Sequence, residues 1–168
     1  MLTAATSVLL ALIGGAYAAT SQEVVLPVEA RTMTAVEIHE VYKNKTWRWE
    51  NGAGRMEDAG RQFNAWADGE KGKSWAEGRW VITNTGLMCL KATWHSRSGA
   101  FPAKACFAHM IHDGTVFQKR ESDGGWYIFR HANPQKDDEA SKLVAVDLVS
   151  ERLAGVKAEV GSTQSSKQ

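Results

Sequence analysis

The sequence predicts a mainly β protein, a single antiparallel up-and-down barrel of about eight strands with one short helix near its N-terminus. Three observations lead to this fold class. First, apolar or alternating segments recur at regular spacing from Lys45 onward. Second, turns rich in Gly, Asn and Asp separate these segments. Third, helix signals nearly vanish over the same stretch. Closure removes the exposed edges of such a meander, so we prefer a barrel to the alternative, a two-layer β-sandwich.

The bulk composition fits one folded domain. A chain of 168 residues with 43% apolar and 23% charged side chains is long enough for one substantial core. The net charge of +1, without a long Lys or Arg run, excludes the basic surface that nucleic-acid binding needs. Seven tryptophans against three tyrosines are the one unusual feature.

The N-terminus carries the pattern of a secretion signal. The apolar run SVLLALIGGAYAA ends in Ala16-Tyr17-Ala18, whose small residues suit signal peptidase. We therefore predict a signal peptide over residues 1–18, an extended leader over 19–33, and a periplasmic or secreted mature protein. The run is too short to cross a bilayer of about 30 Å, so we expect no integral membrane segment after cleavage. A buried N-terminal helix is the alternative.

The predicted barrel domain, residues 34–154, begins with a short helix. Thr34 and Glu37 have the spacing of a capping box, in which each side chain bonds the backbone N–H of the other residue. Ile38 and Tyr42 then lie on one helical stripe. The helix is therefore expected to lay an apolar side against the sheet.

The expected strands follow the helix and end before a polar tail. Residues 142–150 fit either a last strand or a short helix, because their β-branched content and their spacing disagree. Residues 155–168 are polar and predict a disordered tail. The other strands are, in order, KTWRW, RQFNAWA, SWAEGRWVIT, the segment around Cys89, ACFAHMI, GTVFQKRE and WYIFRH.

Export gives the two cysteines a structural role. Thiols outside the cytoplasm meet an oxidising environment, so an even and minimal count predicts one disulfide, between Cys89 and Cys106. The residues around Cys89 alternate as in a strand, HSRSGA offers a turn, and ACFAHMI can return antiparallel with Cys106 roughly opposite. Pro102 lacks a ladder donor, which allows for a connection longer than the tightest hairpin.

The same region suggests a reactive centre as an alternative. His109, His112 and Asp113 are candidate acid-base groups of a hydrolase at the barrel mouth. The two histidines are three positions apart, which puts them on opposite faces of a strand, so we expect no metal site. A disulfide leaves no thiolate for a Cys-His nucleophile. We therefore predict no cofactor and a binding role rather than catalysis.

Candidate ligand-binding residues come from the tryptophans and their polar neighbours. Trp47 and Trp49 share one strand face, and Trp94 flanks the disulfide. Two or three such side chains around a cup, with Arg79 as an anion partner, could hold a small molecule. The alternative is that they fill the core or plug the barrel. The full candidate set is Trp47, Trp49, Arg79, Trp80, Trp94 and His109.

Several of these segments resemble a known family. AVEIHEVYKNKTWRW, EGRWVITNTGLMCLKATW and ACFAH are similar to the proteobacterial family called domain of unknown function 995 (DUF995) over roughly residues 34–131. Its members are mostly short exported proteins, so the resemblance implies export and no known activity. KTW at the start of a strand is also similar to the opening of lipocalin and streptavidin-like barrels, which implies only a calycin-like architecture.

The sequence leads to three functional hypotheses. The first is an exported β-barrel module that binds a small apolar or glycan-like ligand. The second is a protein-interaction module with an envelope partner, such as an inhibitor of an envelope hydrolase. The third is a hydrolase that uses His109, His112 and Asp113.

Overall fold

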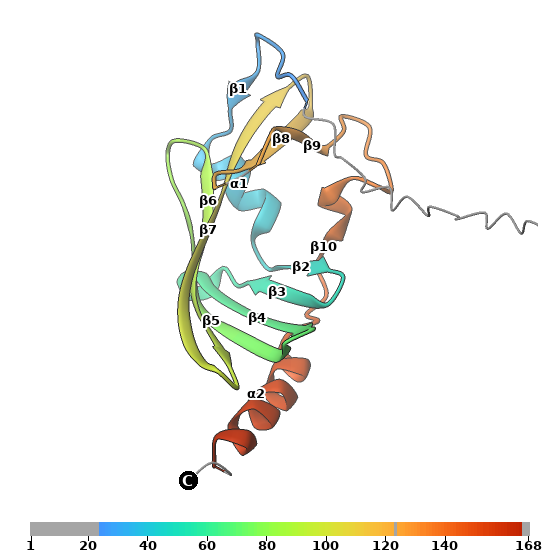
Figure 1. Ribbon diagram of the computed structural model, residues 1–168. Helices are drawn as coiled ribbons and strands as arrows, with labels where there is room; N and C mark the ends of the chain where they lie inside the picture. Colours follow the sequence, from blue (N-terminus) through green and yellow to red (C-terminus); the bar gives the residue numbers. More distant parts are fainter. Residues whose placement is uncertain (1–23, 123, 166–168) are drawn as a thin grey trace, which may run out of the picture.

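The computed structural model describes residues 24–122 and 124–165, with side chains described up to Gly161, so the predicted signal peptide lies outside the described residues. One curled antiparallel sheet wraps around a short helix, and a second helix lies against its outer side (Figure 1). The elements are β1 (Arg31–Thr32), α1 (Ala35–Tyr42), β2 (Lys45–Trp49), β3 (Gly52–Met56), η1 (Ala59–Arg61), β4 (Gln62–Gly69), β5 (Gly72–Ile82), β6 (Leu87–Ser96), β7 (Gly99–His112), β8 (Thr115–Arg120), β9 (Tyr127–Arg130), η2 (Glu139–Lys142), β10 (Leu143–Val144) and α2 (Ser150–Ser165).

The sheet confirms the mainly β antiparallel prediction but not the closed barrel of about eight strands. Its strand order is β10-β2-β3-β4-β5-β6-β7-β8-β9, and β1 adds to β7. Within the described residues no ladder joins β9 to β10, because η2 packs against both β9 and β2 at that position. The result is a curled sheet whose concave face is covered by α1 over part of its length (Figure 1).

Helix α1 begins as its capping box predicts. The Thr34 side chain accepts from the Glu37 backbone N–H, and the Glu37 carboxylate accepts from the Thr34 N–H at 2.8 Å. Nη1 and Nη2 of the Arg31 guanidinium donate to the same carboxylate, at 2.9 and 2.7 Å. These bonds hold the pKa of Glu37 at about 2. Ile38 and Tyr42 are fully buried, so α1 lays its apolar side on the sheet.

Strand β3 is absent from the strands that the sequence predicts. Its sequence, GAGRM, has too little β-branched or aromatic content to signal a strand. The glycine at position 54 is nevertheless required, because a Cβ there would come within 2.7 Å of the Phe63 ring and 3.3 Å of Trp49. Small residues in β3 therefore let aromatic rings from the neighbouring strands lie across it.

Strands β6 and β7 form the predicted disulfide-linked hairpin. Cys89 lies directly opposite Cys106 in the ladder and is bonded to it. The connecting turn is short, in spite of Pro102. The Glu121 N–H donates to the Cys106 carbonyl at 2.9 Å, so the backbone groups of Cys106 point away from β6. Backbone groups alternate in direction along a strand, so those of Pro102, four residues earlier, point the same way. The missing N–H of Pro102 therefore falls on the free edge of the hairpin, where it costs no ladder bond.

The C-terminal segment differs most from the prediction. Residues 142–150 form the two-residue strand β10, a loop and the start of α2, and the disordered tail predicted over 155–168 is wrong for residues 155–165, which are helical. The packing of Val156 and Val160, both buried, explains the helix. Lys73 Nζ also donates to both carboxylate oxygens of Glu159, at 2.6 and 2.7 Å.

Neither α1 nor α2 is sufficiently apolar and extended to cross a bilayer.

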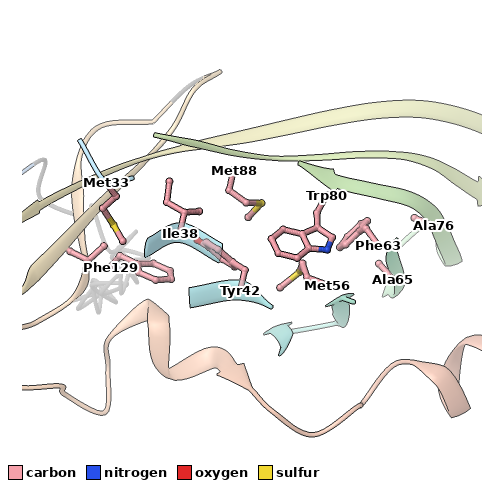
Figure 2. Close-up of a cluster of buried hydrophobic side chains, with 11 residues drawn as sticks. Met33, Ile38, Tyr42, Met56, Phe63, Ala65, Ala76, Trp80, Met88 and Phe129 are labelled. Atoms are coloured by element: carbon pink, nitrogen blue, oxygen red, sulfur yellow. The ribbon is translucent and has the colours of Figure 1, made fainter. Parts of the chain in front are cut away.

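The main core lies between α1 and the concave face. Figure 2 shows its side chains as one continuous layer that runs from Phe129 to Ala76. Trp80 is its largest fully buried member, and the indole N–H donates to the Glu57 carbonyl at 2.7 Å. His39 stacks on this indole with ring centroids 5.7 Å apart. The core thus fills the half of the concave face under α1. Partly buried side chains at its edge, Trp47, Leu90, Trp94 and Phe107, pack against it and also line the site described next.

Candidate ligand-binding site

The half of the concave face away from α1 is an open groove of about 510 Å³. Aromatic and aliphatic side chains from three strands form its walls, and we call this set the aromatic cup. Ala67 contributes the small side chain of β4, and two charged residues, Arg120 and Glu139, also line the groove. The aromatic cup consists of Trp47 and Trp49 of β2, Leu90 and Trp94 of β6, and Phe107 of β7.

Strand periodicity brings these side chains together. Successive residues of a strand point to opposite faces, so Trp47 and Trp49 lie on one face of β2, and Leu90 and Trp94 on one face of β6. The β6–β7 register places Trp94 opposite Phe101, on the concave side. The curl of the sheet then turns β2 towards β6 and β7, although these strands are far apart in the strand order.

A second hollow of about 250 Å³ extends the groove along the β6–β7 hairpin. It shares Trp49, Leu90, Trp94 and Arg120 with the first hollow, so the two form one trough. Its other walls are mostly alanines, Ala92 on β6 with Ala103 and Ala105 on β7, together with Phe63 and Lys104. Small side chains at these positions leave space that larger ones would fill.

Glu139 is the acidic group of the site and is held in place from two sides. Its Oε1 accepts from the Trp47 indole N–H at 3.0 Å, and its Oε2 accepts from Lys142 Nζ at 2.6 Å. The preceding residue, Asp138, is buried and accepts from His131 Nδ1 at 2.5 Å and from two backbone N–H groups. These bonds lower the pKa of Asp138 although its burial acts in the opposite direction.

A buried polar cluster lies behind the aromatic cup. Tyr42 OH and His109 Nε2 are 2.7 Å apart, Gln118 Nε2 donates to the Tyr42 hydroxyl at 2.6 Å, and the Tyr127 hydroxyl donates to Gln118 Oε1. His109 Nδ1 is buried without a hydrogen-bond partner in the described residues. Burial lowers the pKa of His109 to about 4, so the imidazole is neutral at pH 7.

Trp47 separates the polar cluster from the open groove. Its indole ring lies 5.8 Å from the Tyr42 ring and 5.1 Å from the Phe107 ring, centroid to centroid. Desolvation raises the pKa of Tyr42 well above its usual value, so the cluster is uncharged near neutral pH. The cluster therefore supports the floor of the cup and exposes no charge to it.

The structure brings together three of the six predicted binding residues. Trp47, Trp49 and Trp94 line the groove, and His109 lies behind it in the polar cluster. Trp80 belongs to the core under α1, where it is fully buried. Arg79 occupies the opposite face of β5 from Trp80 and donates to the Gly60 carbonyl at 3.0 Å, so it is not an anion partner inside the cup.

The sequence reasoning missed five residues of the groove, and one of them, Ala67, carries no signal in the sequence. Leu90 and Phe107 carry a usable signal, since Leu90 shares a face with Trp94 and Phe107 shares one with His109. Arg120 ends a predicted strand, but nothing in the sequence indicates which face it occupies. Glu139 lies in a polar loop and reaches the cup only because η2 packs between β9 and β2.

The three proposed hydrolase groups do not converge. His109 points into the concave side and is 1% exposed. His112 pairs with Thr115 at the β7–β8 turn, and its Nε2 lies 3.3 Å from the well-exposed carboxylate of Asp113. In residues 24–122 and 124–165, no three His, Cys, Asp or Glu side chains gather in a way that could hold a metal ion. The geometry therefore gives the hydrolase hypothesis no support.

Comparison with known proteins identifies the family of the chain. The family model described as protein of unknown function (DUF995) matches residues 9–149, a span that includes every strand from β1 to β10. No curated protein and no solved structure matches the chain. The match confirms the resemblance seen in the helix, the Gly-Arg-Trp segment and the cysteine hairpin. The chain therefore belongs to the DUF995 family of proteins of unknown function.

Proposed function

We propose that this protein is an exported binding module that holds a small apolar or glycan-like ligand in the aromatic cup. The observation that carries this proposal is the meeting of three tryptophans around one groove of about 510 Å³. Proteins rarely leave several large aromatic faces around an open concave space, because burial of those faces in a core stabilises the fold more. A concave and mostly apolar site with a few polar groups is the usual form of a small-molecule site.

Export is the second part of the proposal. The Cys89–Cys106 disulfide supports it, because disulfides persist in oxidising compartments and are rare in the cytosol. The predicted signal peptide over residues 1–18 supports it independently. Mass spectrometry of protein taken from the cell envelope tests both features. It should find a chain that begins after Ala18 and no thiol that reacts with an alkylating reagent, whereas an intact leader with two reactive thiols would contradict export.

Ligand binding is tested by titration of the intrinsic tryptophan fluorescence. We expect the emission to shift with members of a panel of hydrophobic probes or of oligosaccharides, because three of the seven tryptophans line the groove. A flat response across both panels would contradict the proposal.

Matched variants locate the binding. Trp94→Ala removes a wall of the cup. Trp75→Ala removes an indole from the outer face, where it stacks on His95 with ring centroids 3.9 Å apart. We expect the first variant to weaken binding about tenfold or more and the second to leave the dissociation constant unchanged. An equal loss of affinity in both variants would contradict the placement of the site on the concave face.

One observation favours the second candidate, a protein-interaction module. Residues 99–105 of β7 pair with β6 alone, so this edge is open to another strand, and Phe101 beside it is 53% exposed. Pull-down from envelope extract with the native protein and with a Phe101→Ser variant tests this function. An envelope protein that the native chain retains and the variant loses would support it, and equal retention by both would contradict it.

A further inference from the structure

We propose that the occupant of the trough is an acyl chain that ends in an anionic group, with the chain along the alanines of β6 and β7 and the anion at Arg120. This inference rests on the proposed binding function and narrows its ligand class. It follows from three properties of the trough, namely its lining, its few charged groups and their positions at its rim.

The lining favours a hydrocarbon chain over a sugar. Five of the nine residues that line the inner hollow have side chains that form no hydrogen bonds, namely Phe63, Leu90, Ala92, Ala103 and Ala105. The other four, Trp49, Trp94, Lys104 and Arg120, have side chains that can only donate, so the side chains of the lining offer no acceptor for a sugar hydroxyl group. Sugar hydroxyl groups placed there would lose water without gaining acceptors, which is costly, whereas methylene groups gain from the same burial.

The polar group nearest the cup is already engaged. Glu139, on the wall of the outer hollow, accepts from Trp47 and from Lys142, and it does not line the inner hollow. About half of its acceptor capacity is therefore already used. Its negative charge also directs an anionic end group away from that wall.

Arg120 is suitably placed for the anionic end. It lies opposite Phe107 in the β7–β8 ladder, which puts it on the concave side, and it lines both hollows. The residue is exposed, so the charged end of the ligand stays at the water boundary while the chain enters the trough. A guanidinium has five N–H donors and can hold a carboxylate or phosphate together with another partner.

The trough has a shape that fits a chain. The two hollows lie side by side along β6, where Leu90 and Trp94 are four residues apart, which corresponds to about 13 Å of strand. Ala103, on the far wall, is itself exposed, so the inner end of the trough is accessible. A medium-length unbranched chain is therefore the expected occupant.

The test compares decanoate with decanol by isothermal titration of the whole protein. We expect decanoate to bind about fivefold more tightly at low salt, and this advantage to shrink at high salt because the ion pair is exposed and screened. Arg120→Gln should remove the advantage, and Arg120→Lys should restore part of it. The control is Lys91→Gln, which removes the same charge from the outer face of β6 at a residue that lines neither hollow.

A second pair of variants tests the chain. Ala103→Phe should fill the inner hollow and weaken decanoate binding about tenfold or more, while Ala100→Phe, the same change on the outer face of β7, should not. Both positions are exposed, so neither substitution is expected to prevent folding. Unchanged binding by Ala103→Phe would overturn the placement of the chain.

The outcomes separate this inference from the function on which it rests. If decanol binds as tightly as decanoate, or if oligosaccharides bind and decanoate does not, the acyl-anion inference is wrong and the binding function stands. If no ligand of either panel binds, the function itself fails. Sedimentation with phosphatidylglycerol vesicles identifies the source of the chain. If the source is a bilayer lipid, the vesicles should carry the protein into the pellet, and decanoate should compete with them. If the source is a free acid, the protein should stay in the supernatant.

Discussion

The two halves of the concave face belong to one sheet and differ in what covers them. In one half, α1 places Ile38 and Tyr42 against the sheet, and Trp80 is completely buried. In the other half no α-helix covers the face within the described residues, and Trp49 is 40% exposed at the end of β2. Whether a tryptophan in this chain belongs to the core or lines an open groove therefore depends on whether α1 covers that part of the sheet.

The largest expected effect is on the covered half. Trp80→Ala removes the largest buried side chain and its hydrogen bond to Glu57, and should lower the free energy of unfolding by about 3–5 kcal/mol. Urea unfolding measures this loss. A loss below about 1 kcal/mol would show that Trp80 is not part of the core and would remove the distinction between the two halves.

The disulfide should contribute somewhat less. It closes a 17-residue separation and links the two strands that form the far wall of the trough, so Cys89→Ser should lower the free energy of unfolding by about 3 kcal/mol. Thermal unfolding of the variant, compared with the reduced native chain, measures the same quantity in two ways. An unchanged melting temperature in both would contradict a structural role for the bond.

The polar cluster between the halves predicts a dependence on pH. The pKa of His109 is about 4 in the folded protein against 6.5 as its ordinary value, so between these values the unfolded chain binds more protons. Its contribution to stability is complete above pH 6.5 and is lost as the pH falls towards 4. Between pH 6 and 5 the free energy of unfolding should fall by about 1 kcal/mol.

His109→Gln is the matched variant for this dependence, because an amide can bond Tyr42 but does not titrate. Over the same interval its free energy of unfolding should change much less. The ion pair between Arg31 and Glu37 does not interfere with this measurement. The pKa of Glu37 is lowered from its ordinary value of 4.5 to about 2, so its contribution to the free energy of unfolding is lost only as the pH falls below about 4.5. Parallel curves for the two proteins above pH 5 would contradict a buried neutral imidazole.

The smallest stability effect is expected in the open half. Trp94 is half-buried on the wall of the cup, and Trp94→Ala should lower the free energy of unfolding by only about 1 kcal/mol. The same substitution should have the larger effect on ligand binding. A loss as large as that of Trp80→Ala would show that Trp94 belongs to a core and would weaken the proposal of an open site.

Local patterns predicted much of the fold. The capping box at Thr34, the strand alternation around Cys89 and the turn between β6 and β7 all act over a few residues, and each appears as expected. Strand β3 was missed because its glycines are explained only by the rings of Trp49 and Phe63. The helical C-terminal segment was missed because the packing of Val156 and Val160 on the outer face is a tertiary effect.

The candidate site was only half predictable for a related reason. Period-two alternation correctly grouped Trp47 with Trp49, and it gave the face of Trp94. The role of Trp80 could not be read in this way, because only the position of α1 decides that this part of the face is covered. Nor could the sequence show Arg120 and Glu139 at one groove, since the curl of the sheet and the docking of η2 bring them there.

The most direct test of the open half as a ligand site is a crystal structure of the protein grown with saturating bromine-labelled decanoate. The anomalous signal of the bromine should lie in the inner hollow beside Ala103, with the carboxylate next to Arg120. Bromine on the outer face near Trp75, or an empty groove under conditions where solution binding is saturated, would contradict the proposal.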